Sequence, residues 1–276
     1  MEMENNMITA LASTEIHISL PAEEVFRVGP LSVTNSLILG GIGVIMTVLL
    51  LGFAARMLAA GKTNFLVGLI QWAFEGFLGQ AEEIIGDKAV ARRIFPLAIT
   101  MFFVILVTYW LSVIPGVGAI TLNGVPILRA LPADLNFTFA LAIITTIAAQ
   151  VYAVRVHGIF GNVGRYIKNP FKDPIGAFEG ALEFIGEFSR LIALSFRLFG
   201  NAFAGEVLLL LIAIMTGYLA SLALPFVMVF ELFIGFIQAY VFFVLTLIFT
   251  SLARISHGDH HAEPSHTNIK KGDVPM

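Results

Sequence analysis

The sequence of 276 residues contains no cysteine, which excludes disulfide bridges and thiolate metal sites. It is also poor in charge: Asp, Glu, Lys and Arg make up 13% of the chain, against about 25% in soluble domains. The net charge of −3 gives no support for a nucleic-acid partner. Because the motifs of serine hydrolases, zinc proteases and phosphate-binding loops are missing as well, the sequence predicts neither an enzyme nor a cofactor site.

Apolar residues are abundant instead, at 58% of the chain with a mean hydropathy of +0.89. Five segments are long enough to cross about 30 Å of hydrocarbon, and they lie at about 33–58, 95–114, 135–156, 176–216 and 221–256. The stretch 64–86 is apolar on one face and polar on the other, which indicates a helix at the interface. We therefore predict an all-α integral membrane protein with about five transmembrane helices and one interfacial amphipathic helix.

The last two apolar segments are unusually long. A helix of the 41 residues in 176–216 would extend about 60 Å, so it has to tilt or bend in a bilayer. We predict that 176–256 forms a strongly tilted antiparallel hairpin with its turn near 217–220. Earlier in the chain, Pro96 is predicted to open the second span, and 157–175 is predicted to be a basic loop.

The placement of Lys and Arg predicts the orientation. Thirteen of the 16 basic residues fall in two connections, in the early fourth segment and in the tail, whereas the opposite side carries only Arg27 and Arg129. The positive-inside rule then places the N-terminus outside and the C-terminus in the cytoplasm. The expected organisation is an external segment 1–32, a membrane domain 33–256 and a cytoplasmic polar tail 257–276. The histidines of that tail could bind a metal weakly, but a flexible, solvated tail is the favoured interpretation.

The hairpin carries ionisable residues deep in apolar sequence. Each such residue costs about 2.5–3.5 kcal/mol at the bilayer centre, which points to work done on ions. In an antiparallel hairpin, residues at equal depth have numbers with a constant sum, so Glu206 is predicted to face Glu231, and Arg197 to face Gln238. Two carboxylates that close cannot both ionise cheaply, so we expect the pair to titrate as a unit.

Helical periodicity separates the arginine from the nearest glutamate. Glu183, Arg190 and Arg197 are seven apart and form one stripe, whereas Glu206 is nine residues past Arg197 and lies on the opposite face. Arg197 is therefore predicted to face another group rather than Glu206. A carboxylate presented to it would be neutral against lipid and ionised only beside the arginine, which does not lose its own proton.

At this point the residues resemble a known family. The segment SRLIALSFRLFGNAFAGE (189–206), followed by ELFIGFIQAYVFFVLTLIFTSLA (231–253), is similar to subunit a of the F-type ATP synthase, the membrane stator beside the ring of c subunits. FPLAITMFFVILV (95–107) and PADLNFTFALAI (132–143) resemble the second and third spans of the same family. The resemblance covers about 95–253 and is most specific around Arg-Leu-Phe-Gly-Asn.

The resemblance implies a role for each matching residue. Arg197 matches the essential stator arginine that faces the ring carboxylate, and Asn201 and Gln238 match polar residues near it. Glu206 matches the glutamate of the proton path, and Glu231 matches its partner position.

At the cytoplasmic end, Glu183 matches an acidic residue near the inner half-channel. The implied function is a non-catalytic stator that offers protons two half-channels to and from the c-ring and couples their flow to rotation and ATP synthesis. The implied partners are the c-subunit ring, the b-subunit peripheral stalk, the remaining ATP synthase subunits and the lipid of a bacterial plasma (inner) membrane.

Several of these side chains also have a structural interpretation. Asp134 and Asn136 are candidate channel-lining residues, but their place after Pro132 favours a cap of the third span. Tyr109 and Trp110 are predicted to anchor the second span at the interface.

Alternatives remain for the charged positions and for the function. Arg197 as a snorkelling residue, and the two hairpin glutamates as a structural pair, are the less favoured interpretations. A solvated helix face and a channel mouth fit the acidic series Glu179, Glu183 and Glu187 equally well. A self-contained ion-coupled transporter would usually show internal repeats, and none is seen. An intramembrane enzyme is the third alternative, and no nucleophile and base are spaced for it.

Overall fold

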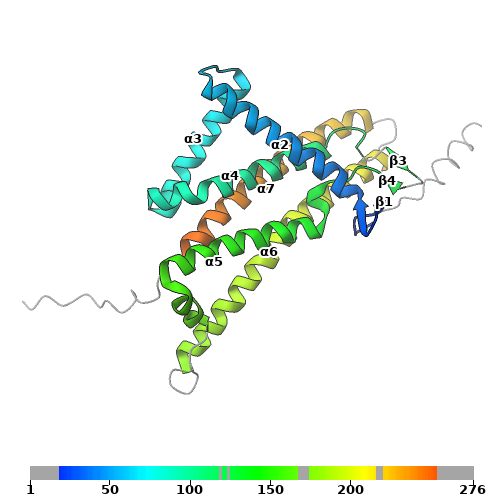
Figure 1. Cartoon of the computed structure of the whole chain (residues 1–276). Helices are drawn as coiled ribbons and strands as arrows, with labels where there is room; N and C mark the ends of the chain where they lie inside the picture. Colours follow the sequence, from blue (N-terminus) through cyan, green and yellow to red (C-terminus); the bar gives the residue numbers. More distant parts are fainter. Residues whose placement is uncertain (1–18, 118–119, 123–124, 167–173, 216–219, 254–276) are drawn as a thin grey trace, which may run out of the picture.

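The computed structural model describes residues 19–117, 120–122, 125–166, 174–215 and 220–253 (Figure 1). Five helices in these ranges are long and apolar enough to cross a membrane: α2 (Asn35–Ala59), α4 (Lys88–Ser112), α5 (Leu135–Tyr166), α6 (Pro174–Met215) and α7 (Ala220–Leu252). A further helix, α3 (Phe65–Ile85), joins α2 to α4 and is not one of these five. The prediction of an all-α membrane protein with five spans is confirmed.

The helices pack in pairs. α4 lies along α7 and α5 lies along α6, while α6 also contacts α7 and α2 contacts α4. In Figure 1, α2, α3 and α4 outline an open triangle, and α4 is the side of it that packs against α7. α6 has 42 residues, which corresponds to about 63 Å and exceeds the hydrocarbon thickness about twofold.

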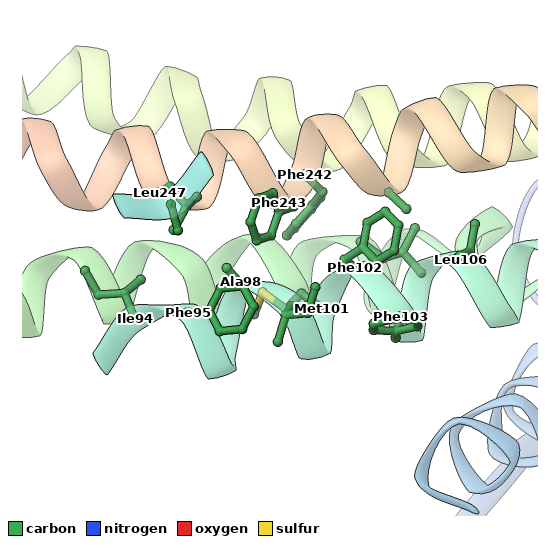
Figure 2. Packing of buried hydrophobic residues seen from close by; sticks show 14 of the residues in the cluster. Ile94, Phe95, Ala98, Met101, Phe102, Phe103, Leu106, Phe242, Phe243 and Leu247 are labelled. Atoms are coloured by element: carbon green, nitrogen blue, oxygen red, sulfur yellow. The ribbon is translucent and has the colours of Figure 1, made fainter. Parts of the chain in front are cut away.

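Aromatic packing fixes α4 against α7. Figure 2 shows Phe242, Phe243 and Leu247 pointing from α7 toward α4. The ring of Phe77 from α3 lies 4.7 Å from that of Phe102 on α4 and 4.8 Å from that of Phe243. Lipid tails are as apolar as these side chains, so close packing rather than exclusion of water holds membrane helices together. The rigid α4–α7 contact also sets where the polar residues of both helices meet.

The predicted start of the second span is wrong. Pro96 lies inside α4, which begins at Lys88. The Asp87 carboxylate caps that earlier start by accepting the N–H groups of Ala89 and Val90 at 2.9 and 3.3 Å. A cap that satisfies two free backbone donors outweighs the preference of proline for a first turn.

The predicted loop 157–175 is also wrong in part. α5 continues through it, broken only at Gly158, whose φ of 73° and ψ of 167° are not helical. Glycine adopts this positive φ without the steric cost that a side chain would bring. Residues 159–166 are helical, while 167–173 lie outside the described residues, as do the hairpin turn at 216–219 and the tail from 254 onward.

Short strands and turns form the segment before α2 and the connection between α4 and α5. β1 (Glu24–Val28) and β2 (Leu31–Thr34) form an antiparallel hairpin, and β3 (Thr121–Leu122) pairs with β4 (Val125–Pro126) before the 3₁₀ turn η1 (Leu131–Ala133). Asn35 connects the β3–β4 pair to the segment before β1. Its Nδ2 donates to the Pro126 carbonyl at 3.2 Å, and its Oδ1 accepts the Glu23 N–H at 3.2 Å.

Candidate functional site

The antiparallel contact of α6 and α7 brings the exposed Asn201 of α6 against buried polar residues of α7. Asn201 Nδ2 donates to Gln238 Oε1 at 2.8 Å, and Gln238 is 2% exposed. Nearer the hairpin turn, Gly205 of α6 lies directly against the Glu231 carboxyl of α7. The constant sum of residue numbers had predicted Arg197 opposite Gln238. The structure places Asn201 there instead, one helical turn from Arg197.

The difference has a geometric reason. Every Cα–Cβ bond of a helix tilts toward the N-terminus of that helix. In an antiparallel pair, side chains that touch therefore come from residues whose numbers sum to more than those of backbone positions at equal depth. The Asn201–Gln238 pair has this larger sum, and the sequence-based rule considered the backbone alone.

Glu231 is held from α4. It is 3% exposed, and its Oε2 accepts a hydrogen bond from the Tyr109 hydroxyl at 3.0 Å. The prediction that Tyr109 anchors the helix at the interface is wrong, since Tyr109 is 2% exposed. Its neighbour Trp110 is 43% exposed and donates its indole N–H to the Leu232 carbonyl at 2.9 Å. An aromatic residue near a helix end usually contacts lipid headgroups, but here the end of α4 packs against α7.

Glu206 is held from the connection between α4 and α5. Its Oε2 accepts Arg129 Nε at 3.3 Å, and its Oε1 accepts the Ala130 N–H at 2.9 Å. Within the described residues no hydrogen bond joins Glu206 to Glu231. Each of the two glutamates thus has its own donor.

Arg129 was missed by sequence reasoning, which counted it only as one of the two basic residues on the side predicted to be external. It is 9% exposed, and its two terminal nitrogens donate to the backbone carbonyls of Leu20 and Pro21 at 3.3 and 2.7 Å. Its guanidinium also lies 5.9 Å from the centroid of the Phe203 ring. Arg129 therefore ties the N-terminal segment, the connection between α4 and α5 and α6 together.

Arg197 differs from Arg129 in its surroundings. Its side chain is exposed on α6, and it makes no hydrogen bond or ion pair with the part of the chain that the structure describes. The neighbouring Leu198 is fully buried, so α6 presents the arginine on its outward face while packing its adjacent face inside.

Asp134 caps the third span, as the structural interpretation predicted. Its Oδ1 accepts the N–H of Asn136 at 2.9 Å, and its Oδ2 accepts the Ser36 hydroxyl at 2.6 Å. Asn136 itself is exposed. Asp134 thereby joins the first turns of α2 and α5 in the same region as Arg129.

The acidic series of α6 is not uniform. Glu179 is exposed and Glu183 is half-buried, whereas Glu187 accepts hydrogen bonds from the Tyr166 hydroxyl at 2.7 Å and from Gln150 Nε2 at 2.6 Å. Sequence reasoning could not find this cluster, because Tyr166 fell in a predicted loop. Among the described residues, no group of three His, Cys, Asp or Glu side chains is arranged to hold a metal ion.

Comparison with known proteins agrees with this arrangement. The family model described as ATP synthase A chain matches residues 37–251. The ATP synthase subunit a of Mycobacterium ulcerans is 32% identical over 223 residues, which cover 79% of this chain and 86% of the relative. That of Desulforamulus reducens is 33% identical over 70% of this chain and 68% of its own length, and that of Acidothermus cellulolyticus is 30% identical over 86% and 79%.

Proposed function

The chain belongs to the family of ATP synthase subunit a, and we propose that Arg197 separates two proton half-channels in it. As a member of that family the chain is a non-catalytic, proton-translocating integral membrane subunit of the ATP synthase. The observation that supports the finer proposal is the placement of Arg197: a permanent cation on an apolar helix face, with no partner among the described residues of its own chain. Intramembrane charges normally pair, so the partner has to come from another subunit.

A carboxyl group of the c-subunit ring fits that position. At about 4 Å and an effective dielectric constant near 20, a guanidinium favours the ionised carboxylate by about 4 kcal/mol. A ring carboxyl would therefore release its proton on reaching Arg197 and take one up on leaving it. The cation also prevents a proton from crossing directly between the half-channels, because arginine stays charged.

The proposed outer path uses Glu206 and Glu231, and the inner path begins near Glu183. In the proposed orientation the N-terminus is outside a bacterial plasma membrane and the C-terminus is cytoplasmic, so the glutamates nearer the hairpin turn face the external side. Asn201 and Gln238 lie between these glutamates and Arg197 along the hairpin. The b-subunit stalk completes the proposed set of partners.

The test substitutes Arg197 with Ala and with Lys and measures ATP synthesis and passive proton flux in vesicles that contain the assembled complex. Both variants are expected to lose coupled synthesis, since the Lys ammonium is a point charge that can lose its proton when buried. Arg155→Ala, which removes an exposed arginine of α5, is the control. Normal synthesis by Arg197→Ala would contradict the proposal.

A further inference from the structure

A buried hydroxyl lies between the two polar clusters of the hairpin. Tyr109 reaches from α4 into the α6–α7 contact, where it donates to Glu231 Oε2 at 3.0 Å and lies 3.4 Å from the Asn201 carbonyl oxygen. The single hydroxyl hydrogen goes to the nearer carboxylate oxygen. Asn201 in turn holds Gln238 through its side chain. Tyr109 therefore stands where the glutamate side of the site meets the Asn201–Gln238 pair.

Two glycines make the room for this contact. A Cβ on Gly235 would lie 2.6 Å from Tyr109 Cδ1, and a Cβ on Gly205 would lie 2.6 Å from Glu231 Cδ. Both separations are far inside van der Waals contact, so neither position accepts a side chain without moving the tyrosine or the carboxyl. At Gly200, also on α6, a Cβ would have no atom of another residue within 4 Å. Of these three glycines, only the two that face the Tyr109–Glu231 pair are closely approached by another side chain.

We propose that Tyr109 is a positioning residue of the outer proton path, whose hydroxyl holds the Glu231 carboxyl toward Asn201 and Gln238. The inference rests on the proposed function, because it assigns Tyr109 a role only through Glu231. A hydroxyl is suited to this place, since it donates to the carboxylate and keeps lone pairs that accept a hydrogen bond in return. A carboxyl fixed in one orientation transfers a proton faster than one that samples several.

The direct test removes the oxygen and keeps the ring. Tyr109→Phe is expected to slow ATP-driven proton pumping by inverted vesicles roughly tenfold, within the range that displacement of a positioned group produces. Tyr240→Phe is the matched control: it removes a tyrosine hydroxyl that interacts with Gln80 of α3, away from both glutamates. We expect the control to pump like the parent, with equal amounts of subunit in the purified complexes.

A combination of variants separates positioning from packing. If Tyr109 acts through Glu231, then Tyr109→Phe adds no further loss in a Glu231→Gln background, whereas a packing defect would multiply the two losses. Pumping measured from about pH 6 to 9 gives a second readout, because a packing defect lowers the rate by one factor at every pH. Gly235→Ala is expected to reproduce the Tyr109→Phe defect by displacing the ring, and Gly41→Ala, at a position with nothing within 4 Å, is its control.

Each result decides between the interpretations. Parent-like pumping by Tyr109→Phe overturns the inference, as do multiplied losses in the double variant or a failure of Tyr109→Phe to assemble while Tyr240→Phe assembles. In these cases a defective Glu231→Gln variant leaves the proposed function standing. Parent-like pumping by Glu231→Gln would instead contradict the proposed outer path itself.

Discussion

Arg129 is expected to hold the N-terminal segment, residues 19–34, against the connection between α4 and α5, and its substitution gives a quantitative test. Arg129→Gln removes the ion pair with Glu206 at 3.3 Å and the bonds to the Leu20 and Pro21 carbonyls. Removing one partner of a fully buried ion pair costs about 3–5 kcal/mol. The Glu206 side chain is 31% exposed and keeps the Ala130 N–H, which lowers the expected cost to about 2 kcal/mol.

The measurement is hydrogen–deuterium exchange of the assembled complex over residues 19–34. The Asn35 N–H donates to the Glu23 carbonyl, and the Glu23 N–H donates to Asn35 Oδ1. These two bonds join the N-terminal segment to α2, so both amides report opening of this segment. A cost of about 2 kcal/mol corresponds to roughly 30-fold faster exchange of the Glu23 amide, provided that the segment opens as a unit.

The control is Arg27→Gln in the same segment. Arg27 pairs with Glu24 at 2.6 Å, but both side chains are substantially exposed, so its loss is expected to change exchange by no more than about twofold. If Arg129→Gln leaves the hydrogen exchange of residues 19–34 unchanged, or if Arg27→Gln accelerates it equally, Arg129 does not hold this segment in place.

Two further predictions concern the glutamates and the α2–α4 contact. Glu206→Gln combined with Glu231→Gln should slow proton entry severely while the complex still assembles; parent-like ATP-driven pumping at every pH would make the pair structural. Gly43→Ala should destabilise the complex by about 1–3 kcal/mol in a thermal unfolding assay, because its Cβ would lie 2.8 Å from Thr108 Cγ2. Gly41→Ala, with nothing within 4 Å, should be neutral or stabilising, and equal behaviour of the two would refute the argument.

The spans were predictable because a helix that crosses lipid has to be apolar over its whole length. The ends were harder, since local signals compete there. At the start of α4, the Asp87 cap prevailed over the proline at 96, and in α5 a single glycine at 158 bent the helix without ending it. Sequence reasoning gave the proline and the loop composition more weight than either signal deserved.

The partners of the glutamates were not predictable for a different reason. The constant sum of residue numbers relates only α6 to α7. Glu231, however, is bound from α4, and Glu206 is bound from the connection between α4 and α5. Neither Tyr109 nor Arg129 stands in a pattern that marks it as buried: a tyrosine near a helix end is typical of an interface anchor, and an arginine in a connection is typical of a solvated loop. Only the packing of α4 on α7 and of the connection on α6 buries them.

The two glutamates therefore differ in what each has free for a proton. Both oxygens of Glu206 accept N–H donors, one from Arg129 and one from Ala130. Glu231 accepts the Tyr109 hydroxyl on Oε2, and its Oε1 accepts no hydrogen bond from any residue in the described part of the chain. Each carboxylate oxygen has two lone pairs, so an oxygen that accepts no donor is the one at which an arriving proton displaces or crowds the fewest contacts. In the proposed path Glu231 is thus the group that takes up and passes on the proton, while Glu206 with Arg129 holds the entrance to it.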